Sequence, residues 1–92
     1  MKTNSITRKF GKMIRLDVTY SDHIETIKIT GDFFLHPEDT LDLIVLELTG
    51  ASIPIQKERL IKKINLILHN QKAEIIGVTA EELITTLEEA TQ

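Results

Sequence analysis

The sequence contains no cysteine and no tryptophan, and only two prolines, three phenylalanines and one tyrosine among its 92 residues. Without cysteine there can be no disulfide framework, no thiolate nucleophile and no cysteine-ligated zinc or iron–sulfur site. No apolar run approaches the roughly 20 residues that cross a bilayer, and residues 1–12 lack the apolar core of a secretory signal. We therefore expect a cytoplasmic protein with no membrane partner.

The composition is that of a folded chain, with 41% hydrophobic and 27% charged residues, unlike the low-apolar, high-charge composition of disordered segments. A chain of this length has room for one hydrophobic core, and burying roughly 60–65% of its unfolded surface gives only a modest stability margin. So small a core leaves little space for a deep, water-excluding cleft. We expect one domain that works on the surface of another protein.

Charge is unevenly distributed along the chain, although the net charge is only −3. Residues 1–16 contain five basic residues and no acid, whereas the remaining residues carry six basic and fourteen acidic side chains. The five basic residues are Lys2, Arg8, Lys9, Lys12 and Arg15. Residues 1–10 show no hydrophobic periodicity, so we expect a flexible basic arm there, followed by a single domain over residues 11–92. Such an arm is either a solvated tail or a contact for phosphate or an acidic partner.

Two alternating runs predict a β-hairpin. The pattern alternates from residue 12, with every second side chain apolar from residue 14 to residue 20, and a second alternating run covers residues 24–30 after a Ser-Asp turn. Gly31 and Asp32 interrupt the alternation, and the apolar run at residues 33–35 then predicts a bent third strand.

Three helices follow in the prediction. The segment 36–39, His-Pro-Glu-Asp, is a typical helix start, and the first helix is expected to run to about Leu48 before Gly50 stops it. A second helix is predicted over residues 56–70, and a Thr-x-x-Glu capping box at residue 79 starts a final helix of about eleven residues. Residues 73–78 fit either a connector or a short strand, and we interpret them as a connector. The predicted fold is therefore α+β, a small antiparallel β-sheet (β-β-β) followed by about three helices packed on one face.

The sequence contains no recognisable catalytic motif. The three histidines lack the spacing and nearby carboxylates of a metal site, no serine occupies a Gly-x-Ser-x-Gly elbow, and the four glycines form no phosphate-binding loop. We expect no catalytic residue, no metal and no cofactor bound by this chain alone.

Phe33 and Phe34 are adjacent, so on a strand their side chains point to opposite faces. One ring should belong to the core, and the other would then be an exposed anchor for a partner. The alternative is that both rings are buried on a two-sided sheet. His36, directly before Pro37, is either a partner contact or an ordinary surface residue at a helix start.

Residues 11–18, Gly-Lys-Met-Ile-Arg-Leu-Asp-Val, and residues 29–38, Ile-Thr-Gly-Asp-Phe-Phe-Leu-His-Pro-Glu, resemble the accessory domain of lipoate-protein ligases. In that family a Gly-Lys strand, a hairpin and a Gly-Asp-Phe-Phe element lead into a helix. The resemblance covers nearly the whole domain, residues 11–92. Because the chain contains nothing else, it is similar to the form in which this domain is a separate small subunit of a bipartite ligase.

The resemblance implies a non-catalytic subunit that is required, with the catalytic large subunit, to activate lipoate to lipoyl-adenylate. Lipoate and ATP, with magnesium, would bind at that partner subunit, and lipoyl-acceptor proteins would be indirect partners. The candidate interface or lid residues are Lys12, Arg15, Gly31, Asp32, Phe33, Phe34, His36 and Pro37. Lys12 and Arg15 could equally be solvated strand charges.

Two other functions fit the sequence. The chain could be an adaptor that presents the same exposed edge to an unrelated protein, or a nucleic-acid-binding module that uses the basic arm. We expect no nucleic-acid partner, because the rest of the chain is acidic and aromatics are few.

Overall fold

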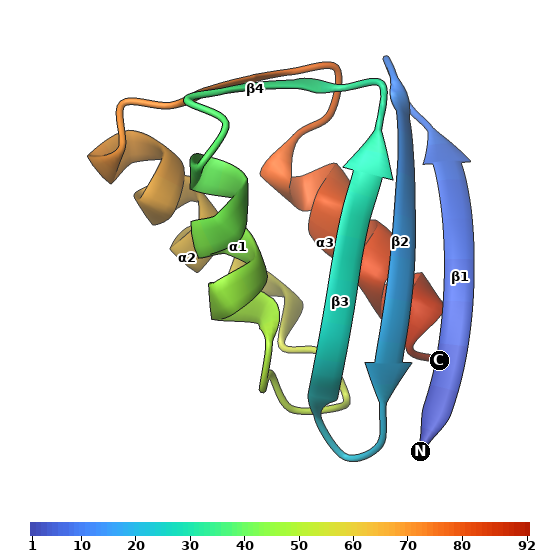
Figure 1. The fold of residues 1–92 in the computed structure, drawn as a ribbon. Coiled ribbons are helices and arrows are strands. Elements are labelled where there is room, and N and C mark those ends of the chain that lie inside the picture. The colour runs from blue at the N-terminus through green and yellow to red at the C-terminus, as the bar shows by residue number, and fades with distance from the viewer.

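The computed structural model describes all residues, 1–92, as an α+β fold with two separate sheets (Figure 1). The chain order is β1 (Lys2–Lys9), β2 (Met13–Tyr20), β3 (Ile24–Gly31), β4 (Phe34–His36), α1 (Thr40–Leu48), α2 (Lys57–Asn70), β5 (Glu74–Ile76) and α3 (Ala80–Ala90). The main sheet is antiparallel in the order β1-β2-β3, and β4 pairs with β5 in a second, two-stranded antiparallel sheet.

The predicted hairpin is confirmed as β2 and β3. Leu16 lies opposite Ile29 and Val18 opposite Ile27, and all four side chains are buried. Because side chains alternate along a strand, the intervening residues, including Arg15, form the other face of the sheet, which is solvated.

Strand β1 corrects the expectation of a flexible arm over residues 1–10. Lys2–Lys9 pairs with β2 along its whole length, from Lys2 opposite Tyr20 to Lys9 opposite Met13. Long-range contacts hold β1 to the last helix: the Asn4 side-chain amide donates a hydrogen bond of 3.0 Å to the Ala90 carbonyl. Seven of the eight residues of β1 are exposed, and only one of its side chains, Ile6, is apolar. The sequence therefore offers no period-two signal for this strand.

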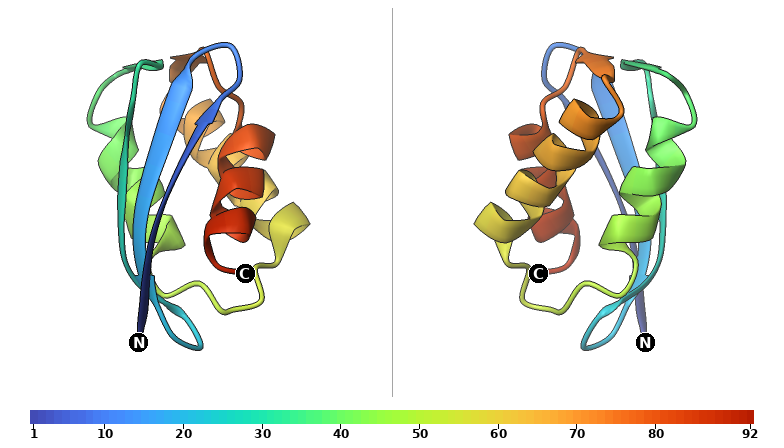
Figure 2. Two further views of the ribbon diagram at one scale, coloured as in Figure 1. Left: turned by 90° about the vertical axis from the view of Figure 1, so that its right-hand side faces the viewer. Right: turned by 90° about the vertical axis from the view of Figure 1, so that its left-hand side faces the viewer.

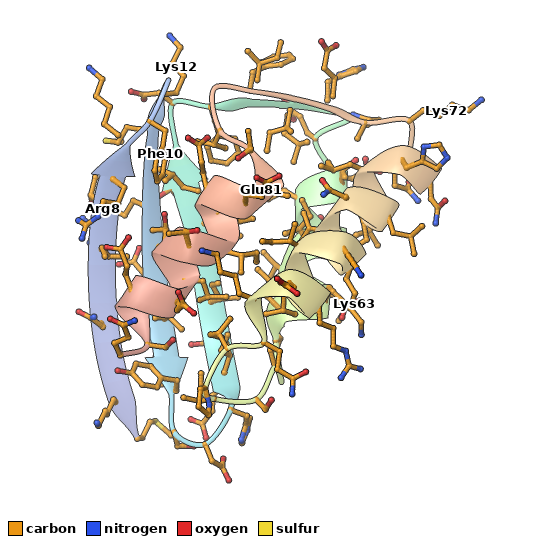
Figure 3. The ribbon with its side chains drawn as sticks, turned by 180° about the vertical axis from the view of Figure 1, so that it is seen from behind. Arg8, Phe10, Lys12, Lys63, Lys72 and Glu81 are labelled. Carbon is orange, nitrogen blue, oxygen red and sulfur yellow. The ribbon has the colours of Figure 1, made fainter.

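The three helices lie on the side of the main sheet to which the apolar residues of β2 and β3 point. Helix α3 lies across β1 and β2, α1 packs beside β3, and α2 packs against both other helices (Figures 1 and 3). One core cluster joins them, with Leu16 from the sheet, Ile44 from α1, Ile64 from α2 and Leu87 from α3 all nearly inaccessible to solvent. The predicted packing of helices on one face is confirmed. None of the helices combines the length and the apolar character of a membrane span.

Local signals fix most helix ends. Helix α2 begins one residue after the predicted start, and the predicted capping box of α3 is present: the Thr79 hydroxyl accepts from the Glu82 amide, and the Glu82 carboxylate accepts from the Thr79 amide. Helix α1 begins at Thr40 rather than at Pro37. The residues between form a tight turn, in which the Thr40 amide donates to the Pro37 carbonyl at 3.1 Å.

The expected third strand is present as β4, but its pairing differs from the prediction, and the expected connector contains a strand. Residues 34–36 form β4, which does not extend the main sheet but pairs with β5, and β5 lies inside the segment 73–78 predicted to be a connector. The chain leaves the main sheet at Gly31, and the Asp32 amide donates a hydrogen bond of 3.0 Å back to the Met13 carbonyl. This bend carries β4 across the end of the helical layer, where β5 is available for pairing (Figure 1).

Candidate partner-binding site

One end of the molecule brings together the turn between β1 and β2, the connection from β3 to β4, and β5. Both chain termini lie toward the opposite end (Figure 2). The Lys12 amide donates a hydrogen bond of 2.9 Å to the Gly77 carbonyl, which ties the turn to β5. The Lys12 side chain projects outward at this end (Figure 3), and we call this region the β4–β5 end.

Two glycines allow close packing at the β4–β5 end, Gly31 against the backbone of β2 and Gly77 against the Lys12 side chain. At Gly31 (φ +153°) an added Cβ would lie 2.2 Å from the Met13 carbonyl oxygen, and at Gly77 (φ +103°) it would lie 2.3 Å from Cγ of Lys12. Contacts this short are forbidden, so only glycine fits at either position. The site is therefore placed by backbone contacts between segments that are far apart in the sequence.

The β4–β5 sheet exposes an apolar pair. Phe34 and Ile76 lie directly opposite each other across the two strands, and they are 57% and 50% exposed. Leu35, between Phe34 and His36, points to the opposite face of the sheet. It is only 7% exposed and anchors the small sheet to the core. The His36 ring stacks on Phe34, with ring centroids 6.4 Å apart and an interplanar angle of 12°. An exposed aromatic held in place by a stacked neighbour is a rigid contact that loses little side-chain entropy on binding.

A hollow of about 730 Å³ adjoins this pair, between the start of β4 and the start of α1. Phe33, Phe34 and Leu41 contribute apolar surface to it, above the buried Ile29 and Leu35. The end of β3 and acidic residues before and within α1 contribute its polar lining. No group of three or more histidine, aspartate or glutamate side chains in the structure is arranged to hold a metal ion. The end of the molecule thus offers a mixed apolar and acidic surface.

Comparison with known proteins gives one informative match. No protein-family model and no curated protein matches this sequence. A solved structure from Thermoplasma acidophilum, described as part of an archaeal lipoylation system with a bipartite lipoate protein ligase and its E2 lipoyl domain, matches with 31% identity and a TM-score of 0.63. The match covers 95% of this chain and 93% of the other. This chain belongs to the bipartite lipoate-protein ligase family. The match is consistent with the small subunit of such a ligase.

Most of the residues predicted to bind the ligase partner lie at or beside the β4–β5 end. Lys12 projects from the turn, Gly31 and Asp32 form the bend, and Phe34 and His36 form the exposed face. Phe33 and Pro37 are half-buried. The prediction that one of the two neighbouring phenylalanines is exposed is confirmed, and the alternative that both are buried is wrong.

Arg15 lies apart from this group, on the solvated face of the main sheet. Its guanidinium donates to both carboxylate oxygens of Asp17, at 3.2 and 3.1 Å, and the Ser5 hydroxyl donates to the same carboxylate. These hydrogen bonds, from Arg15 first and then from Ser5, lower the pKa of Asp17. The hydrogen bond and the charge of Asp17 in turn raise the pKa of Arg15. The Arg15 charge is thus already matched within the chain.

Sequence reasoning missed Ile76 and the acidic residues of the hollow. The signal for Ile76 was the β-branched pair Ile75-Ile76 just before Gly77, because β-branched residues favour strands. The acidic residues Glu38 and Asp39 were interpreted only as helix-start residues, since their position next to Phe34 depends on the bend at Gly31.

Proposed function

We propose that this chain is the non-catalytic accessory subunit of a bipartite lipoate-protein ligase. It docks on the catalytic large subunit and is required for the activation of lipoate to lipoyl-adenylate, which precedes transfer of the lipoyl group to an acceptor protein. Lipoate and ATP, with magnesium, bind at the large subunit, and the complex acts in the cytoplasm. The observation that carries the proposal is the exposed Phe34–Ile76 pair on a fold that matches a bipartite ligase structure over almost its full length.

The chemistry of lipoate activation explains why a ligase benefits from such a subunit. Lipoyl-adenylate is a mixed anhydride that water destroys, so its site must close once both substrates are bound. A small rigid body that covers the site excludes water and holds the reactants in line without supplying a reactive group. The 92-residue chain is small enough for this task and exposes an apolar pair that could contact the large subunit.

The apolar pair is the part of the surface best suited to dock on the large subunit. Central aromatic residues dominate the energetics of protein interfaces, and truncating one typically costs about 1–4 kcal/mol of binding free energy. The pairing of β4 with β5 places the Phe34 backbone, and the Phe34 ring lies nearly parallel to the His36 ring. Lys12 and His36 at the margin would adjust specificity rather than supply most of the affinity.

The test measures pyrophosphate released by the large subunit with lipoate and magnesium-ATP, with and without this chain. We expect lipoyl-adenylate formation to depend on the chain. The double variant Phe34→Ala, Ile76→Ala should raise the chain concentration needed for half-maximal activity by about tenfold or more. Leu66→Ala is the matched control, because Leu66 is also 57% exposed but lies on α2 and not in the β4–β5 sheet.

Equal rates of lipoyl-adenylate formation with and without the chain would contradict the proposal. Turnover by the isolated chain would contradict its non-catalytic part. Stable co-purification with an unrelated protein, together with no effect on the ligase, would favour the adaptor alternative. The nucleic-acid alternative required a flexible basic arm. Residues 2–9 instead form β1, and Arg8 makes an ion pair of 2.6 Å with Glu89.

A further inference from the structure

The hollow beside Phe34 combines an apolar lining with an uncompensated negative rim. Its volume is about 730 Å³, within the range of binding pockets in proteins. Ile29 and Leu35 are buried beneath it, Phe33 and Leu41 are half-buried, and Phe34 forms an exposed wall. The hollow is therefore continuous with the surface proposed to dock on the large subunit.

The polar lining of the hollow includes Thr30 and three acids, Glu38, Asp39 and Asp42, which we call the rim. All three are exposed, and no side-chain hydrogen bond or ion pair in the structure involves any of their carboxylates. Asp17, Glu47 and Glu89 form ion pairs within the chain, but several acids outside the rim do not, so the rim acids are distinguished by their position beside an apolar hollow. Acids at the start of α1 complement the helix dipole, but that role does not require an apolar hollow next to them.

The apolar lining and the negative charge together define the occupant. An arginine or lysine side chain has an apolar stem and a cationic head, which match an apolar floor and a carboxylate rim. A metal ion does not fit, because these acids do not converge as ligands. We propose that the hollow receives an arginine or lysine side chain, with its apolar neighbours, from the catalytic large subunit. This inference rests on the proposed function and adds the chemistry by which the two subunits recognise each other.

The test compares two variants that lose the same charge. The rim variant carries Glu38→Gln, Asp39→Asn and Asp42→Asn. The control variant carries Glu58→Gln, Glu81→Gln and Glu88→Gln, which lie on α2 and α3 and make no side-chain ion pair in the structure. Asp42, Glu58 and Glu81 each occupy the first turn of a helix, so both variants weaken helix dipoles similarly. Circular dichroism confirms that each variant folds.

Stopped-flow association with the large subunit gives the readout, at low and at high salt. We expect the rim variant to lose about tenfold in association rate at low salt and to lose most of the salt dependence of the wild-type chain, since rim charges act mainly on encounter. The control variant should lose less than about threefold.

Three results would overturn the inference while leaving the proposed function intact. The rim variant could associate like the wild-type chain, both variants could weaken equally, or the chain alone could form a dimer that only the rim variant abolishes. The last result would make a second copy the occupant, through its basic strand β1. A wild-type chain that does not bind the large subunit at all would instead refute the proposed function, and the inference with it.

Discussion

Replacing Gly31 by alanine tests the backbone junction that places β4. Gly31 is the last residue of β3 and adopts φ +153°, a conformation that L-residues rarely adopt. An alanine Cβ at this position would lie 2.2 Å from the Met13 carbonyl oxygen and 3.0 Å from the Ile14 Cα. Both atoms belong to the backbone of the neighbouring strand, so no side-chain rotation relieves the overlap.

The cost of Gly31→Ala has two parts. The unfavourable φ costs about 1–2 kcal/mol for a residue with a Cβ. Separation of the two strands would also weaken the hydrogen bond of 3.0 Å from the Asp32 amide to the Met13 carbonyl, which contributes about 1 kcal/mol. We therefore expect the free energy of unfolding to fall by about 2–3 kcal/mol, a large fraction of the stability of a small domain.

Gly50→Ala separates the conformational cost from the overlap. Gly50 also has a positive φ, +90°, but an added Cβ meets nothing within 4 Å. This variant should lose only the φ term, about 1–2 kcal/mol. Urea unfolding followed by circular dichroism gives both values. If Gly31→Ala is no more destabilising than Gly50→Ala, the close approach of the Gly31 and Met13 backbones is not a real constraint.

Two further predictions concern the capping box of α3 and the ion pair on the open face of the sheet. Thr79→Ala removes the hydroxyl that accepts from the Glu82 amide and should lower the free energy of unfolding by about 1 kcal/mol, a fall in Tm of about 4–8 °C; Thr85→Ala, inside the same helix, should not. The lowered pKa of Asp17 stabilises the fold above the ordinary carboxyl pKa, and this contribution is lost as pH falls below about 4. The urea midpoints of the wild-type chain and Asp17→Asn should therefore converge between about pH 6 and about pH 2.5, and a difference that stays constant would show that Asp17 has the same pKa in the folded and unfolded chains.

Elements with a local signal were predicted correctly. The hairpin of β2 and β3 alternates apolar and polar residues, and α2 repeats its apolar residues at helical spacing. The capping box at Thr79 fixed the start of α3. Each of these patterns involves neighbouring residues, so it can be recognised before any tertiary contact is known.

Strands β1 and β5, and the pairing of β4, were not predicted correctly because their signals are not local. β1 exposes most of its side chains, and its position depends on pairing with β2 and on contacts with α3, such as that between Arg8 and Glu89. β4 and β5 have three residues each, too few to show a period. Phe34 is paired with Ile76, which lies beyond two intervening helices.

The sequence by itself determined an α+β class, the central hairpin, the three helices and the likeness to a lipoate-ligase accessory domain. Each of these depends on patterns among residues that are close together in the sequence. Only the tertiary structure decided that the basic N-terminal segment is a strand and that Phe34, Ile76 and the acids before α1 form one surface. The physical reason is the bend at Gly31, where two backbones approach too closely for any side chain and turn β4 away from the main sheet. The composition of this surface depends on which distant segment pairs with β4 after the bend. No short-range pattern in the sequence specifies that pairing.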